Sequence, residues 1–226
     1  VGDLRRDRAR YVAAGNPPVF ERKLVTLLLR TNADTATYTI ERGGTSMARR
    51  VAMLPLPTSA AKRPRFPVGE SARVLPGNIG YINMGDVEPD QVDSAIAIVR
   101  NSSGIVFDVR NRPRDTMFQF AAFLNPEPRP FVRWASVDTS YPGQVRWDPG
   151  SPVGSPGGNP AHYRGRVAIL VDERTQSHAE FTVMALRTAP ENKVVGSQTA
   201  GADGDITWTF LPGGIRVVFT GLGVYY

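Results

Sequence analysis

The stretch RVAILVDERTQSHAEFT, residues 166–182, predicts a buried strand, a sharp polar turn and a helix. Val167 to Val171 form an unbroken apolar run, which favours a parallel strand covered on both faces over an edge strand with one wet face. Ser177 then stands just past the carboxyl end of that strand, the end at which open α/β sheets bind ligands. Free backbone N–H groups and the positive end of the helix dipole would surround it there.

Two roles are open for this serine. A hydroxyl beside free N–H groups suits a nucleophile with an oxyanion site. Ser and Thr are also common helix caps, so Thr175 or Ser177 would then merely close the first turn. A nucleophile elbow of the Gly-x-Ser-x-Gly kind is excluded, because Thr175 and Ala179 stand where that motif has glycines.

From residue 78 onward, strand patterns alternate with helical ones. Repeated strand–helix–strand units predict an α/β fold, of mixed α+β character, with a parallel or mixed sheet under helical cover. The expected elements are strands at 78–84 and 104–110, helices at 90–102 and 114–126, the Ser177 helix to about Thr188, a strand at 193–198, a glycine-rich loop, and a closing hairpin of 205–212 with 214–226.

Residues 1–56 predict a small helix–hairpin piece. Apolar residues at i, i+4, i+7 and i+8 indicate a helix at 17–30, and alternating patterns on both sides of a Gly-Gly pair indicate strands at 35–42 and 48–56. The piece is too small for a comfortable core of its own, so we expect the chain to be a trimmed fragment.

Two proline-rich segments interrupt the regular patterns. Residues 57–77 carry four prolines among small and basic residues and predict a linker, which leaves residues 78–226 as the main domain. Residues 127–162 predict a long loop, inserted near the rim of the site and partly ordered by Trp134 and Trp147.

Composition excludes several classes of protein. The chain has no cysteine and two histidines, so neither a disulfide framework nor a thiolate or histidine-rich metal site is expected, and no cofactor is implied. The net charge of +6 comes from arginines that are interspersed with acidic residues, without a nucleic-acid module, so nucleic acid is not an expected partner. No apolar run approaches the roughly 20 residues that span a bilayer, so no integral membrane segment is expected.

Three segments in this order resemble the tail-specific or C-terminal processing serine peptidases: GNIGYINMGDV, GIVFDVRNRPRD, and VAILVDERTQSHAEFTVMAL running into VVGSQTAGADGD. The resemblance implies a ClpP/crotonase-like peptidase core for residues 78–226 and a partial PDZ-like segment for residues 1–56. It also implies a polypeptide substrate and a periplasmic or extracytoplasmic location. A homo-oligomer is compatible with it.

The resemblance assigns roles to several residues. Ser177 aligns with the nucleophile, and Glu180 aligns with the acidic residue that follows in the first helical turn. The oxyanion donors would be the backbone N–H of His178 and one from the element after DVRNRP, where this chain has Arg114 and Asp115 instead of glycines.

The expected base is missing. Serine–lysine members have a lysine 25 positions after the serine, and this chain has Ala202 there. His162 and His178 are the candidate replacements, since a serine hydroxyl needs a group to remove its proton. Asp203 and Asp205 lie in the right loop, but a carboxylate of ordinary pKa is a poor base for serine. A base from outside this core is a further alternative.

Two functions follow. The first is a serine endopeptidase that cleaves extended polypeptides. The alternative is a catalytically inactive family member that binds peptide or a small apolar ligand, for which a long apolar pocket beneath residues 117–135 would be expected. A third reading treats Ala202 as an engineered replacement of a catalytic lysine.

Overall fold

The computed structural model describes residues 2–28, 30–54 and 67–226. The chain divides into two compact units, Val1–Ala13 with Phe20–Pro64, and Ala14–Val19 with Arg65–Tyr226. No helix in the described ranges has both the length and the apolar character that crossing a membrane requires.

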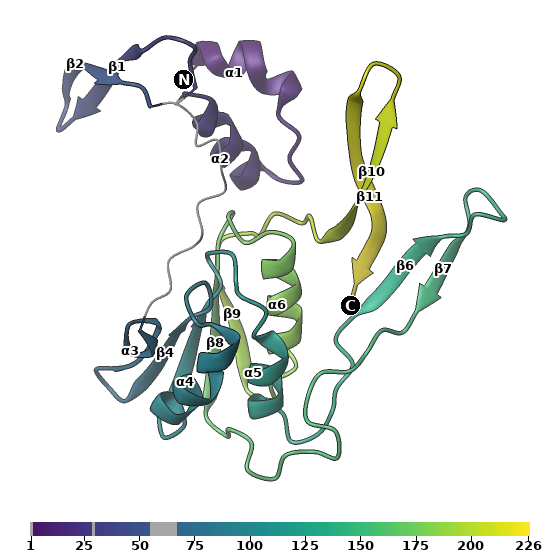
Figure 1. The fold of residues 1–226 in the computed structure, drawn as a ribbon. Helices are drawn as coiled ribbons and strands as arrows, with labels where there is room; N and C mark the ends of the chain where they lie inside the picture. The colour runs from purple at the N-terminus through teal and green to yellow at the C-terminus, as the bar shows by residue number, and fades with distance from the viewer. Residues whose placement is uncertain (1, 29, 55–66) are drawn as a thin grey trace. The chain divides into compact units, whose positions relative to one another are not determined.

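The first unit contains the predicted helix and hairpin (Figure 1). Helices α1 (Gly2–Arg8), η1 (Ala9–Tyr11) and α2 (Pro17–Leu28) precede strands β1 (Thr35–Arg42) and β2 (Thr45–Ala52). The two strands pair antiparallel around a turn in which Gly43 and Gly44 have positive φ. That these elements belong to a PDZ-like domain stays a prediction.

The second unit is built on a five-stranded sheet, which confirms the α/β prediction. Its order is β3 (Ala72–Leu75), β4 (Ile79–Asn83), β5 (Gly104–Asp108), β8 (Arg166–Val171) and β9 (Asn192–Gly196). β3 is antiparallel to β4, and the other neighbours are parallel. The helices are α3 (Val68–Ser71), η2 (Pro89–Gln91), α4 (Val92–Val99), α5 (Met117–Leu124) and α6 (His178–Leu186).

The linker prediction is wrong for the part that can be checked. Residues 57–66 lie outside the described residues, but α3 and β3 occupy the segment from residue 68 to residue 75. Pro67 and Pro76 flank these elements rather than interrupt them, and Gly77 and Asn78, both with positive φ, turn the chain from β3 into β4. The core therefore begins before residue 78.

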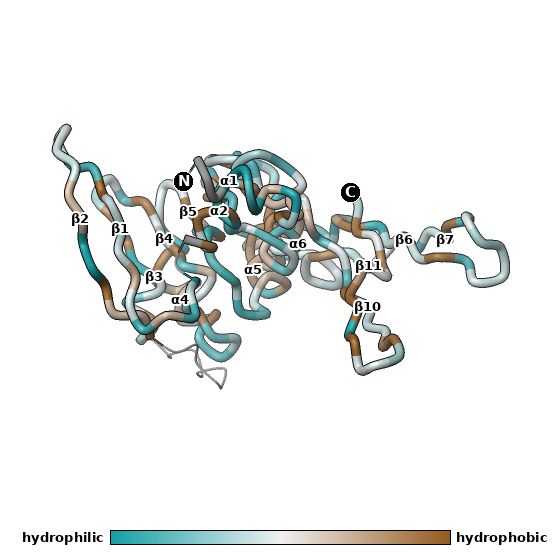
Figure 2. Tube along the Cα trace, turned by 90° about the horizontal axis from the view of Figure 1, so that it is seen from above, coloured by the Kyte–Doolittle hydropathy of each residue, from teal (hydrophilic) through white to brown (hydrophobic). Residues whose placement is uncertain are grey.

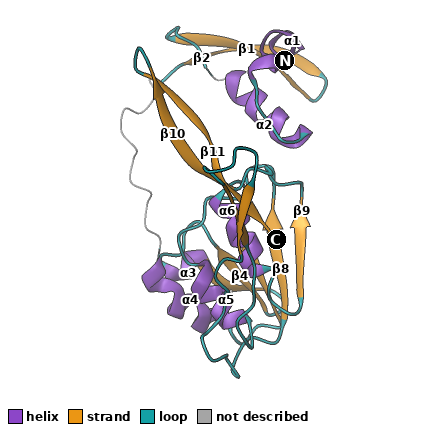
Figure 3. Ribbon diagram, turned by 90° about the vertical axis from the view of Figure 1, so that its right-hand side faces the viewer, coloured by secondary structure: helices purple, strands orange, loops and turns teal. Residues whose placement is uncertain are grey.

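One face of the sheet carries most of the core. Along β8, Val167, Ile169 and Val171 are buried, whereas Ala168 and Leu170 point to the opposite face and are half-buried. Figure 3 shows α4 and α5 on one side of β8 and β9. The expectation that both faces are covered is therefore wrong for the residues that the structure describes, because an apolar run does not distinguish a buried face from a half-buried one.

The segment 127–162 is not a loop throughout. It contains the hairpin of β6 (Arg133–Val137) and β7 (Val145–Asp148), which extends the closing hairpin of β10 (Gly204–Leu211) and β11 (Ile215–Tyr225) into a second sheet of order β10-β11-β6-β7. Hydrophobic residues recur along β10 and β11 (Figure 2). Trp134 packs on Phe181 of α6 at 5.4 Å between ring centroids, so this sheet adjoins the helix that Ser177 begins.

We expect replacement of Phe107 by Ala to lower the free energy of unfolding by about 3–5 kcal/mol, since it opens a cavity at the centre of the core. Phe107 is fully buried on β5 and meets the Phe120 ring edge-on at 5.4 Å. Urea denaturation measures the change. Phe210→Ala is the matched control, because Phe210 is 70% exposed and its loss should change stability by no more than about 0.5 kcal/mol. Equal effects of the two variants would contradict this account of the core.

Candidate active site

Ser177 has an unusual backbone conformation. Its φ is 55° and its ψ is −126°, and among the described non-glycine residues only Asn78 shares a positive φ. Ser177 is the N-cap of α6, but an N-cap residue ordinarily has extended backbone dihedrals, so capping alone does not account for this conformation. Strained residues of this kind cluster at functional sites, where the surrounding structure holds them in place.

Thr175 has a different role from the predicted cap. Its hydroxyl donates to the Val109 carbonyl at 3.0 Å and accepts from the Asp172 N–H at 3.1 Å. It therefore fastens the turn that follows β8 to the end of β5. Of the two residues proposed as caps, only Ser177 occupies the N-cap position.

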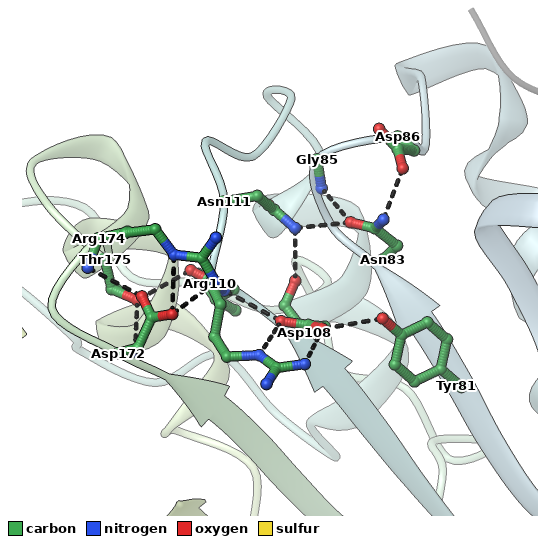
Figure 4. A network of polar contacts seen from close by, with 11 residues as sticks. Tyr81, Asn83, Gly85, Asp86, Asp108, Arg110, Asn111, Asp172, Arg174 and Thr175 are labelled. Carbon is green, nitrogen blue, oxygen red and sulfur yellow. Dashed lines mark hydrogen bonds and ion pairs between the residues drawn. The ribbon is translucent and has the colours of Figure 1, made fainter. Parts of the chain in front are cut away.

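The carboxyl ends of β4, β5 and β8 share a network of polar contacts (Figure 4). Asp108, at the end of β5, accepts hydrogen bonds from the Tyr81 hydroxyl at 2.8 Å and from Arg110 Nη2 at 2.7 Å. Burial acts to raise the pKa of Asp108, but the hydrogen bonds from Arg110 and Tyr81 hold it below its ordinary value. Burial and the bond to Asp108 raise the pKa of Tyr81 to about 12. At neutral pH, Asp108 therefore stays ionised and the Tyr81 hydroxyl stays protonated.

The rest of the DVRNRPRD element is anchored to the loop after β4. Asn111 donates to Asn83 at 2.6 Å, and Arg114 forms an ion pair with Glu88 at 2.7 Å. The Arg114 N–H donates to the Met84 carbonyl at 3.1 Å. Because that N–H is engaged within the fold, the prediction that Arg114 supplies an oxyanion donor is wrong in this conformation.

His178 and Asp115 lie together beside Ser177. The His178 N–H is the first of α6 and has no intrahelical acceptor, which suits the predicted oxyanion donor. The His178 Nε2 lies 3.1 Å from Asp115 Oδ1 but makes no hydrogen bond. Burial lowers the pKa of His178, while the charge of Asp115 opposes that change. That Asp115 contributes its backbone N–H stays a prediction.

Glu180 joins the serine turn to the loop that follows β9. Its carboxylate accepts from the N–H groups of Ser177 at 3.1 Å, Gly201 at 2.7 Å and Ala202 at 3.0 Å, and from the Thr199 hydroxyl at 2.7 Å. The Ser177 N–H also reaches the Ala202 carbonyl at 3.1 Å. Glu180 is therefore occupied as an acceptor and acts as a positioning residue rather than as a base.

The structure separates the two histidines proposed as bases. His162 lies before the amino end of β8 and lines a different cavity, and the six residues of β8 separate it from the serine by about 20 Å. The prediction that His162 is the base is therefore wrong in this conformation. His178 lines a cavity with Ser177, and its Nε2 is buried and makes no hydrogen bond. That His178 is the base stays a prediction.

Two cavities meet at Ser177, with volumes of about 630 Å³ and 390 Å³. Ser177, Asp203, Gly204, Ile206 and Val224 line both. The larger cavity also includes Glu180, Met184, Ala202, Tyr225 and Tyr226, and the smaller includes Arg112, Trp134, His178, Phe181 and Asp205. Ala202, at the position expected for lysine, thus lies in the serine cavity.

Asp203 departs most from the sequence-based expectation. Burial, and then the charge of Glu180, raise its pKa from 3.8 to about 7. Its Oδ2 atom is buried and makes no hydrogen bond. The sequence placed Asp203 in this loop and predicted a carboxylate of ordinary pKa. It could not show the burial or the nearby Glu180 charge that raise the pKa.

Comparison with known proteins gives a family match and a set of similar structures. The model of peptidase family S41 matches residues 78–225. A search of the curated proteins found no match. A putative peptidase from Parabacteroides merdae is 21% identical with a TM-score of 0.54, over 70% of this chain and 54% of that one. Mature CPAF complexed with lactacystin is 14% identical with a TM-score of 0.66, over 97% and 67%. The chain thus spans about half to two-thirds of these relatives.

We expect Glu180→Gln to loosen the loop at 199–202, because an amide offers one acceptor oxygen where the carboxylate satisfies four donors. The free energy of unfolding should fall by about 1–3 kcal/mol, and amide hydrogen exchange of Gly201 and Ala202 should accelerate. Glu173→Gln is the matched control, since Glu173 accepts a surface hydrogen bond from Ser197. Unchanged exchange in Glu180→Gln would show that the loop does not depend on this carboxylate.

We expect Asp203→Asn to stabilise the protein above pH 7 and to leave it unchanged near pH 4. The folded state holds a proton on Asp203 up to about pH 7, whereas the unfolded chain releases it near pH 3.8. The ionisation of Asp203 therefore lowers the free energy of unfolding of the protein as pH rises between those values. At about 1.4 kcal/mol for each pKa unit the full shift corresponds to about 4 kcal/mol, and because solvent screens this partly exposed carboxyl we expect a gain of about 1–2 kcal/mol.

Urea denaturation at pH 4 and pH 8 measures this difference. Asp205→Asn, which removes an exposed carboxylate two residues further on, in β10, is the charge-matched control. A gain of equal size at both pH values would mean that the Asp203 carboxyl does not retain its proton.

Proposed function

The chain belongs to peptidase family S41, as its resemblance to the C-terminal processing peptidases predicted, and we propose that it is a serine endopeptidase in which Ser177 attacks the peptide bond. The observation that carries the proposal is the conformation of Ser177. A positive φ at the carboxyl edge of a parallel sheet, where two cavities meet, directs this residue toward a ligand.

The chemistry follows from the groups around Ser177. The hydroxyl oxygen attacks the carbonyl carbon of the scissile bond, and the oxygen of that carbonyl becomes negative. The His178 N–H at the start of α6 would stabilise this oxyanion, helped by the helix dipole. Glu180 holds the turn, because its hydrogen bonds connect Ser177 with Gly201 and Ala202.

The two cavities support an extended polypeptide as the substrate. Both are lined by Ser177, so the residues that flank a scissile bond held at the serine would have space beside it. Aromatic and apolar side chains line both, among them Tyr225 and Tyr226 in the larger and Trp134 and Phe181 in the smaller. Cleavage near a carboxyl terminus, a PDZ-like role for residues 2–54 and extracytoplasmic residence are parts of this proposal that rest on the family.

One observation favours the inactive alternative, in which the cleft only binds peptide or an apolar ligand. Ala202 lines the larger cavity at the position expected for the lysine base, and it has no proton acceptor in its side chain. This alternative also requires an apolar pocket beneath residues 117–135. Met117, Ala121 and Val132 of that segment pack with Met184 and Ala185 in a buried cluster, so their side chains do not line an open pocket.

We expect the wild-type chain to hydrolyse an unfolded protein substrate and to react covalently with a fluorophosphonate probe. Ser177→Ala should abolish labelling and reduce turnover at least about 1,000-fold, because the nucleophile is removed. Ser151→Ala is the control, since Ser151 is exposed in another segment. A wild-type chain that neither reacts nor turns over substrate would favour the binding alternative.

A further inference from the structure

We propose that Asp203 is the general base of this site: it takes the proton of the Ser177 hydroxyl and later delivers it to the leaving amine. The inference rests on the proposed peptidase function. It answers a gap in that function, since Ala202 replaces the expected lysine and His162 lies at the other end of β8.

Backbone contacts bring Asp203 to the reacting centre. The Ser177 N–H donates to the Ala202 carbonyl at 3.1 Å, and Asp203 is the next residue. Asp203 and Ser177 both line the two cavities that meet at the serine. Gly204, Ile206 and Val224 line both cavities as well, but apart from Ser177 only Asp203 in this shared set has a side chain that can accept a proton.

The Asp203 carboxyl has spare hydrogen-bonding capacity. Its Oδ2 is buried and makes no hydrogen bond, an arrangement that native structures usually avoid because it costs about 1–3 kcal/mol. Glu180 is the other carboxylate in the larger cavity, and it already accepts four hydrogen bonds. Asp203 is therefore the carboxyl that can accept a new proton without breaking a contact that shapes the site.

The electrostatics are also suited to proton transfer near neutral pH. Burial and the neighbouring Glu180 raise the pKa of Asp203 to about 7, close to the value at which a general base works best. When Asp203 takes a proton, the repulsion between the two carboxylates disappears. The other titratable groups that line the cavities are Tyr225 of β11, Tyr226 after it, Asp205 of β10, His178 of α6 and Arg112 of the loop after β5.

The proposed steps balance. As Ser177 Oγ bonds to the carbonyl carbon, its proton moves to Asp203 and the carbonyl π electrons move to oxygen. The oxyanion collapses, the carbon–nitrogen bond breaks, and the amine leaves with the proton from Asp203. Water then gives a proton to Asp203 as it attacks the acyl ester, and Ser177 leaves with that proton. The sum is one peptide bond and one water converted to a carboxylic acid and an amine.

The test combines a pH profile with substitutions in the whole chain. In the wild type, kcat/KM should rise with pH around a midpoint of about 7, because the deprotonated carboxylate is the active form. Asp203→Asn should reduce kcat by about 100- to 10,000-fold, leave KM nearly unchanged and remove that midpoint. Asp203→Glu should retain part of the activity. Asp93→Asn, which removes an exposed carboxylate of α4 outside both cavities, should keep the wild-type profile.

A second substitution separates loss of the base from loss of structure. Ala202→Lys introduces an amine at the position of the family's base, so the double variant Ala202→Lys with Asp203→Asn should regain turnover and fluorophosphonate reactivity. Recovery would show that the serine turn is intact without the Asp203 carboxylate.

Three results would overturn the inference. The first is an Asp203→Asn variant that keeps more than a tenth of the wild-type kcat. The second is a loss confined to KM for substrates with cationic side chains, which would make Asp203 a binding group. The third is a double variant that folds and stays inactive. An inert wild type, unlabelled and without turnover, would instead overturn the proposed peptidase function and this inference with it.

Discussion

The site depends on the Glu180 carboxylate and the donors that converge on it. Ser177 and Glu180 belong to one helical turn, whereas Thr199, Gly201 and Ala202 come from the loop after β9, so the carboxylate closes a contact between segments separated in sequence. A positive φ at a serine is unfavourable by about 1–3 kcal/mol and persists only where surrounding contacts hold it. Charge-assisted bonds to backbone N–H groups are strong enough to do so. The same contacts that strain the serine also place Ala202 and Asp203 beside it.

Polar contacts at the carboxyl ends of β5 and β8 also hold the serine turn in place. The pair Asp108 and Arg110 ends β5, and the Thr175 hydroxyl reaches across to the Val109 carbonyl, so β5 and β8 are fixed to each other at the edge where the serine turn begins. Parallel strands bring their carboxyl ends to one edge, which is why segments distant in sequence meet there. The second sheet encloses this edge from another direction, because Trp134 of β6 stacks on Phe181 of α6. Ser177, Trp134 and Phe181 thus line the same cavity.

The sequence predicted the elements better than their environments. The run at 167–171, the helix at 90–102 and the closing hairpin all appear, because local periodicity determines them. It did not predict β3, or the hairpin of β6 and β7, since both are short and are stabilised by partners elsewhere in the chain. At the site, the strand–turn–helix pattern predicted the position of Ser177, whereas the roles of Ser177 and Glu180 came from the resemblance to the family. The occupied N–H of Arg114 and the buried carboxyl of Asp203 could not, because each depends on a contact between distant segments.

The residue at position 202 and the basicity of Asp203 are physically coupled. An ammonium group beside Glu180 and Asp203 would favour the ionised form of both carboxyls and lower the pKa of Asp203. With alanine there, the larger cavity contains two carboxyls and none of the described cationic side chains, so burial and the charge of Glu180 raise the pKa of Asp203. Alanine at the position where the resemblance predicts a lysine therefore leaves burial and the charge of Glu180 to raise the pKa of Asp203 to about 7. The absence of the family's base at position 202 does not by itself remove the means to activate Ser177.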